Sequence, residues 1–182
     1  MAEKQFELFL TEVRAGWLEA RIVHDGEHYD LSVSCSFSEP LKDLFSCLCD
    51  LYQLEALPDL LEDYRHFEFE WGGEGWLYYW TIIPGPGGVL QVDIEFKGKR
   101  EAGGVEHPVW SISAMTDWQT LAGQVFTQTS EMLWMYGFSG YYDRWSKDFP
   151  AGKMMRLGHL LHGQARDTDD FSRELGYLAE TR

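Results

Sequence analysis

Alternation of apolar and polar side chains with a period of two is the feature of this sequence that most constrains its fold. We expect strands within residues 5–35, 64–71, 76–83, 89–97 and 105–113. This period puts successive side chains on opposite faces of an extended strand, whereas a helix needs a period of 3.6. The segments between these strands are rich in glycine, and Asp25-Gly26 in particular is typical of a tight hairpin. The pattern predicts antiparallel sheet.

Two longer segments show helical spacing. After Ser38-Glu39-Pro40, where Ser is a candidate N-cap, apolar residues recur on one face as far as Pro58. The second helix is predicted to start at Thr116-Asp117-Trp118-Gln119, which fits a capping box. Shorter helices are expected over residues 153–162 and 171–179.

The order of these elements predicts an α+β fold with two β-β-β-α passes. We expect one antiparallel sheet of six or seven strands with helices packed mainly on one face, followed by a C-terminal helical extension. Two smaller sheets are the alternative. The 182 residues suit a single domain, predicted over residues 1–163, with a hinge and a short helix over 164–182.

The charge balance restricts the partners that this chain can have. Asp and Glu total 30 against 15 Lys and Arg, a formal net charge of −15. A negative field disfavours nucleic acids and anionic membranes, which are themselves polyanions, and favours a basic protein. The alternative is that the acidity only keeps a bacterial-type cytosolic protein in solution. A cytoplasmic location is expected because the three cysteines do not form a disulfide framework, the N-terminus lacks a signal pattern, and no apolar run is long enough to span a membrane.

Strand parity gathers carboxylates on one predicted face. Glu68 and Glu70 alternate with aromatic residues, and Asp93 and Glu95 alternate with aliphatic ones. On the strand between them, Tyr79 has the opposite parity to its aromatic neighbours, so one set must share the carboxylate face. We expect the excess carboxylates to concentrate on this face. The candidate partner-binding residues are Tyr64, His66, Glu68, Glu70, Trp76, Tyr78, Trp80, Asp93 and Glu95. An ordinary half-solvated sheet would show the same alternation.

Catalytic and cofactor motifs are not found in the sequence. Cys35 is predicted to be a buried thiol, His66 has only strand neighbours as metal ligands, and the glycine-rich segment 84–88 leads into a strand rather than a helix. We therefore expect no enzyme activity, no metal and no cofactor.

These features predict an acidic protein-binding module that masks a basic partner, as an immunity protein or antitoxin-like toxin inhibitor does. The alternative is a small-molecule binder or unrecognised enzyme whose aromatic pocket is formed by the C-terminal region Trp134 to Phe149. We expect that region to complete the core instead. A homodimeric assembly subunit is a third possibility.

Overall fold

The computed structural model describes residues 6–55, 66–98, 101–102, 105–106 and 109–163. Its first three strands are β1 (Phe6–Arg14), β2 (Trp17–His24) and β3 (Glu27–Ser34), which form an antiparallel meander. Both turns have two residues with positive φ: Ala15 and Gly16 have φ of 52° and 80°, and Asp25 and Gly26 have φ of 54° and 83°. Such turns match the twist of the strands they join. The predicted meander is confirmed.

A second antiparallel sheet contains β4 (Phe67–Gly72), β5 (Trp76–Pro84), β6 (Val89–Gly98) and β9 (Trp110–Asp117), in the order β4-β5-β6-β9. A 3₁₀ turn, η2 (Pro86–Gly88), connects β5 to β6, and β7 (Glu101–Ala102) pairs with β8 (Val105–Glu106) in a small ribbon. The expectation of one sheet of six or seven strands is therefore wrong. The alternative of two smaller sheets fits the described residues better.

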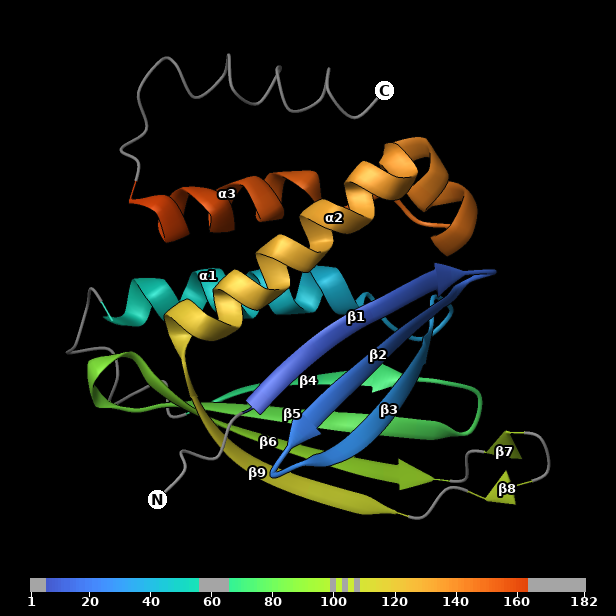
Figure 1. Ribbon diagram of the computed structural model, residues 1–182, viewed down its shortest axis with the longest axis horizontal. Helices are drawn as coiled ribbons and strands as arrows, with labels where there is room; N and C mark the ends of the chain where they lie inside the picture. The colour runs from blue at the N-terminus through green and yellow to red at the C-terminus, as the bar shows by residue number, and fades with distance from the viewer. Residues whose placement is uncertain (1–5, 56–65, 99–100, 103–104, 107–108, 164–182) are drawn as a thin grey trace.

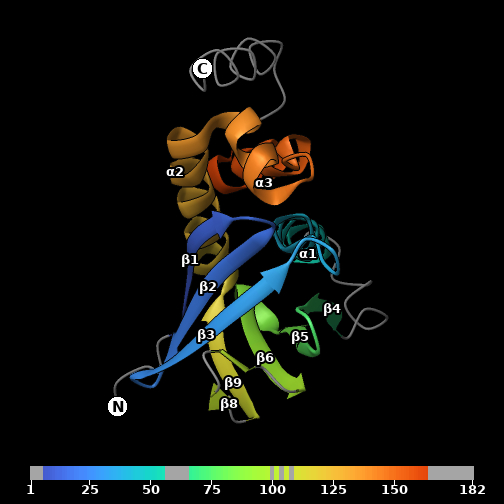
Figure 2. The ribbon, with the colours of Figure 1, turned by 90° about the vertical axis from the view of Figure 1, so that its right-hand side faces the viewer.

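The two sheets are separate because the first lies across the second rather than beside it (Figures 1 and 2). Trp17 of β2 stacks on Trp76 of β5, with ring centroids 5.8 Å apart. Tyr29 of β3 packs on Trp110 of β9 at 4.8 Å. These contacts join apolar faces, which bury more nonpolar area than edge-to-edge strand pairing.

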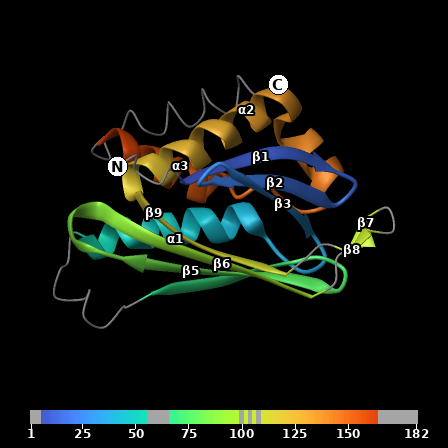
Figure 3. The same cartoon turned by 60° about the horizontal axis from the view of Figure 1, so that its bottom comes forward.

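Three helices complete the described fold: α1 (Pro40–Glu55), α2 (Trp118–Trp145) and α3 (Ala151–His162). They and β1–β3 lie on one side of the four-stranded sheet (Figure 3). The Ser38 hydroxyl ties the start of α1 to the second sheet, since it accepts from the Gly72 N–H at 2.6 Å and lies 3.4 Å from the Glu70 carbonyl oxygen, to which it donates. The N-cap of α2 is Asp117 rather than Thr116, because the Asp117 carboxylate accepts from the backbone N–H of Thr120 at 2.8 Å.

The core lies between the two sheets and the helices and is unusually aromatic. Its largest fully buried side chains are Trp71, Trp80, Trp145, Tyr78, Tyr141, Phe45 and Phe96. Tyr141, Trp145 and Phe149 come from the C-terminal aromatic stretch, so these three residues do complete the core as predicted. Trp134 and Tyr142 are exposed. The stretch also contains a break at Gly137, where α2 is kinked at a φ of 65°.

Several predictions fall outside the described residues: those for Tyr64, for the helix over 171–179, and for the hinge that would separate 164–182 from the main domain. Within the described part of the chain, no helix is both long enough and apolar enough to cross a membrane.

Candidate functional site

The side of the four-stranded sheet that faces away from the helices carries the predicted carboxylates. In the register, Glu70 of β4 lies opposite Tyr79 of β5, and Tyr79 lies opposite Glu95 of β6. The next row on the same face is formed by Glu68, Thr81 and Asp93. Residues directly opposite on antiparallel strands have Cβ atoms about 5 Å apart. Two parallel rows therefore cross the sheet, each with a carboxylate on both sides of a central β5 residue.

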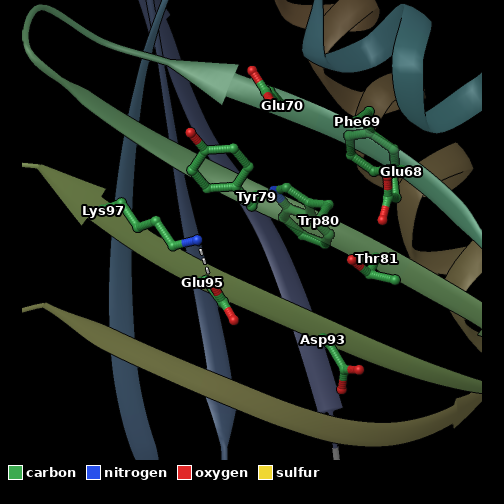
Figure 4. A pocket seen from close by; sticks show the side chains of 9 residues that line it. All are labelled: Glu68, Phe69, Glu70, Tyr79, Trp80, Thr81, Asp93, Glu95 and Lys97. Carbon is green, nitrogen blue, oxygen red and sulfur yellow. Dashed lines mark ion pairs between the residues drawn. The ribbon is translucent and has the colours of Figure 1, made fainter.

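This surface is hollowed into an open concavity of about 530 Å³ (Figure 4). We call it the acidic face. Its outward-facing lining residues are Glu68, Glu70, Tyr79, Thr81, Asp93, Glu95 and Lys97, and it is also bordered by Phe69 and Trp80, whose side chains belong to the inward parity of β4 and β5. Right-handed sheet twist makes such a surface concave along one diagonal, so the hollow follows from the strands themselves and not from a loop.

Lys97 is the cation among the residues that line the acidic face. Its ammonium nitrogen lies 2.7 Å from a Glu95 carboxylate oxygen and 4.5 Å from the centroid of the Tyr79 ring. The hydrogen bond to Glu95 raises the pKa of Lys97 above its ordinary value. Sequence reasoning did not select Lys97, although its position two residues after Glu95 places it on the same face.

Two other carboxylates of the face, Asp93 and Glu68, have partners other than lysine. The Gln91 amide nitrogen lies 3.1 and 3.0 Å from the two carboxylate oxygens of Asp93. His66 Nε2 lies 3.4 Å from a Glu68 oxygen, with both side chains more than half exposed. Four carboxylates thus meet one lysine on this surface, which leaves it net negative near neutral pH.

The prediction that Trp76, Tyr78 and Trp80 lie on this face is wrong. Tyr78 and Trp80 are 0% and 1% exposed, because the parity that they share with Trp76 points into the core. The Trp76 indole N–H donates to the Ser32 carbonyl at 3.0 Å, which holds its ring between the sheets. Tyr79 is the aromatic residue of β5 that faces outward. Alternation along β5 puts either Trp76, Tyr78 and Trp80 or Tyr79 on the carboxylate face, because the two sets point to opposite sides of the sheet. With the first set in the core, Tyr79 is the aromatic residue on the carboxylate face.

Carboxylates are not confined to this surface, so the expected concentration of the whole acidic excess on one face is wrong. Exposed acidic residues also lie on the first sheet and on the helices, among them Glu27, Asp50, Glu131 and Asp143. What distinguishes the acidic face is its arrangement: four carboxylates in two rows around a hollow, on strands that are fixed by core packing.

Other chemical candidates do not assemble into a site in the described residues. Cys47 and Cys49 are buried, and burial raises the pKa of the Cys47 thiol, which keeps it protonated. The described part of the chain contains no group of three or more His, Cys, Asp or Glu residues that could hold a metal ion. His162 of α3 packs edge-on against Phe126, with ring centroids 5.8 Å apart.

Comparisons with known proteins found little. No family model matches the chain, and no curated protein matches it. Among solved structures, a CdiA-CT/CdiI toxin and immunity complex from Enterobacter cloacae is similar at 10% sequence identity and a TM-score of 0.38, over 69% of this chain and 99% of the matched chain. A similarity this low defines neither the fold nor the function of this chain.

Proposed function

We propose that this chain is an acidic protein-binding module that masks a basic partner protein, in the manner of an immunity protein or antitoxin-like inhibitor. The observation that carries the proposal is the arrangement of Glu68, Glu70, Asp93 and Glu95 around one open hollow. Complementary charge steers a basic partner toward such a surface and fixes its orientation. The net charge of −15 also attracts a basic protein over a longer range.

The packing of the strands beneath the acidic face supports a role in binding over the alternative that the face is only an ordinary solvated surface. The strands that carry the carboxylates alternate them with buried residues such as Trp71, Val92 and Ile94. Strands anchored in this way hold the backbone positions of the carboxylates at a fixed spacing, so a partner has only to order the side chains on binding. A preorganised set of charges gains more from complementarity than a mobile one.

In this role the chain carries out no catalytic step. It acts in the cytoplasm, and its partner is a protein, not a nucleic acid or a membrane. Acidic surfaces repel both of those polyanions. The rival hypothesis, an aromatic ligand pocket in the C-terminal region, is not favoured. Tyr141, Trp145 and Phe149 would be its walls, and they are buried in the core.

Affinity capture with charge-reversed variants tests the proposal. The immobilised chain is exposed to native lysate at low and high salt, and captured proteins are compared for wild type and the double variant Glu68→Lys/Glu70→Lys. We expect a basic protein to be retained by wild type and its purified form to bind the double variant about tenfold more weakly or worse. Raising the salt should slow association, since screening shortens the reach of the field.

The matched control is Glu131→Lys/Asp143→Lys, which changes the net charge equally at two exposed positions of α2. This variant should retain the partner nearly as well as wild type. If both double variants lose binding equally, the attraction is a general effect of net charge and the acidic face is not the site. A captured partner without excess basic charge would also contradict the proposal.

A further inference from the structure

Tyr79 and Glu95 converge on the ammonium group of Lys97 within the acidic face. The Lys97 ammonium sits 2.7 Å from the Glu95 carboxylate and 4.5 Å from the Tyr79 ring centroid (Figure 4). A ring face and a carboxylate that converge on one position attract a positive charge by two different interactions. Lys97 therefore shows where a cation is held on this surface.

The lysine is held only loosely. The side chains of Lys97 and Glu95 are 57% and 53% exposed, and ion pairs this exposed contribute little to stability because water screens them and the side chains lose entropy. Lys97 can therefore leave its position at small cost. The same position is attractive to another cation that brings additional contacts with it.

A second carboxylate makes the position more negative than one lysine can compensate. Glu70 lies across Tyr79 from Glu95 in the same row of the sheet. Glu70 therefore adds negative charge on the β4 side of the ring, while Glu95 contacts the cation from the β6 side. Guanidinium suits this geometry better than ammonium, because it is planar, stacks on aromatic rings and binds carboxylates through two parallel N–H groups.

We propose that Tyr79, Glu95 and Glu70 form an arginine subsite, which Lys97 fills in the free protein and from which an arginine of the basic partner displaces it. This inference rests on the proposed function and specifies the group that the acidic face recognises. Lys97 is then an internal competitor. It lowers the affinity of the face for cations in general. Only partners that supply an arginine at this position then displace it and bind.

The test uses hexa-arginine peptide as the probe and follows the backbone amide signals of the acidic face by NMR. Two variants each remove one positive charge: Lys97→Met empties the subsite, and Lys153→Met alters an exposed position on α3. Dissociation constants are read separately at Thr81 and Glu95. We expect Lys97→Met to bind the peptide about two- to fivefold more tightly than Lys153→Met, the range that an exposed ion pair allows.

A third variant tests the ring. In the Lys97→Met background, Tyr79→Leu should weaken peptide binding by about two- to fivefold, as expected when an exposed cation–π contact is lost. Hexa-lysine should lose less than hexa-arginine from the same change, since ammonium stacks less well on a ring.

The outcomes separate this inference from the proposed function. Equal affinities for Lys97→Met and Lys153→Met, with shifts still present at Glu68 and Asp93, would overturn the arginine subsite but leave the acidic face as a basic-partner surface. Absence of shifts across the whole face would contradict both. Tighter binding of Lys97→Met that Tyr79→Leu reverses supports the subsite.

Discussion

Gln128 of α2 accepts a hydrogen bond from the backbone N–H of Leu10 in β1 at a distance of 2.6 Å. Its amide nitrogen also donates to the Leu8 carbonyl oxygen at 2.6 Å. One turn earlier, Gln124 accepts from the Leu8 N–H at 3.1 Å. The two glutamines bond to the edge of β1 as a neighbouring strand would. An edge strand with unpaired backbone groups is a template for aggregation, and here a helix satisfies those groups.

This contact gives the first prediction. Gln128→Ala leaves the Leu8 carbonyl and the Leu10 N–H without their partner, so we expect the free energy of unfolding to fall by about 1–3 kcal/mol. Urea denaturation measures the change, and hydrogen exchange should show faster exchange of the Leu10 amide. Gln119→Ala, at an exposed position of the same helix, should change stability by much less. Equal effects at the two positions would show that the contact to β1 contributes nothing.

The N-cap of α2 gives a second prediction. The Asp117 carboxylate accepts from the Thr120 hydroxyl at 2.6 Å and from the Thr120 N–H at 2.8 Å, and these bonds lower the pKa of Asp117. Asp117→Ala should destabilise the protein by roughly 1 kcal/mol, while Asp117→Asn, which keeps an acceptor, should cost less.

The pH dependence of this effect has a definite sign. Because the folded-state pKa of Asp117 is depressed, its charge stabilises the fold above the unfolded-state pKa, and this stabilisation is lost as the pH falls through the folded-state value. The difference between wild type and Asp117→Ala, followed by denaturation across acidic pH, should therefore narrow toward low pH. A difference that widens on acidification would contradict the assignment.

Asp43 is expected to behave in the opposite way. Burial in α1, followed by repulsion from Glu39, raises the pKa of Asp43 to about 6. The folded state then holds the proton more tightly than the unfolded state, so stability from this group is present below the unfolded-state pKa and is lost as the pH rises through about 6. Asp43→Asn should therefore stabilise the protein at pH 7, by about 1–2 kcal/mol after allowance for partial solvation.

Denaturation of Asp43→Asn and wild type at several pH values measures this gain, which should disappear near pH 4. Asp50→Asn, at an exposed position of the same helix, is the control and should give a smaller gain at neutral pH. A gain that stayed constant from pH 4 to pH 7 would mean that ionisation of Asp43 is not its cause.

Two buried tryptophans give a matched comparison of hydrogen bonding in the core. The Trp118 indole N–H donates to the Leu48 carbonyl oxygen at 2.8 Å. The buried Trp80 indole N–H meets no acceptor in the part of the chain that the structure describes. Phenylalanine keeps much of the ring volume but removes the N–H in both cases.

We expect Trp118→Phe to cost about 1 kcal/mol more than Trp80→Phe, since only the first change breaks a hydrogen bond and the second removes an unpaired polar group. Equilibrium urea denaturation of the two variants measures the difference. Equal losses would indicate that ring volume alone decides the cost.

Local sequence patterns were sufficient to predict most elements. The strands of the first meander, the turn at Asp25-Gly26 and the helix that begins at Pro40 were predicted from alternation, turn residues and helical spacing. These features depend on neighbours within a few residues, so the sequence displays them directly. The N-cap of α2 at Asp117 instead of Thr116 is an error of one residue, because either side chain can cap and local geometry selects between them.

Strand periodicity alone establishes which side chains share a face, because residues two apart on a strand point the same way. That is why the sequence groups Glu68 with Glu70 on one strand, and Asp93 with Glu95 on another. The division of the strands into two sheets, and the outward position of Tyr79 rather than Trp80, depend on tertiary contacts instead. Both faces of β5 carry aromatic rings, so alternation alone does not show which face is buried. Packing between distant segments, such as Trp17 on Trp76, makes that choice, because it buries more apolar area than the alternative arrangement.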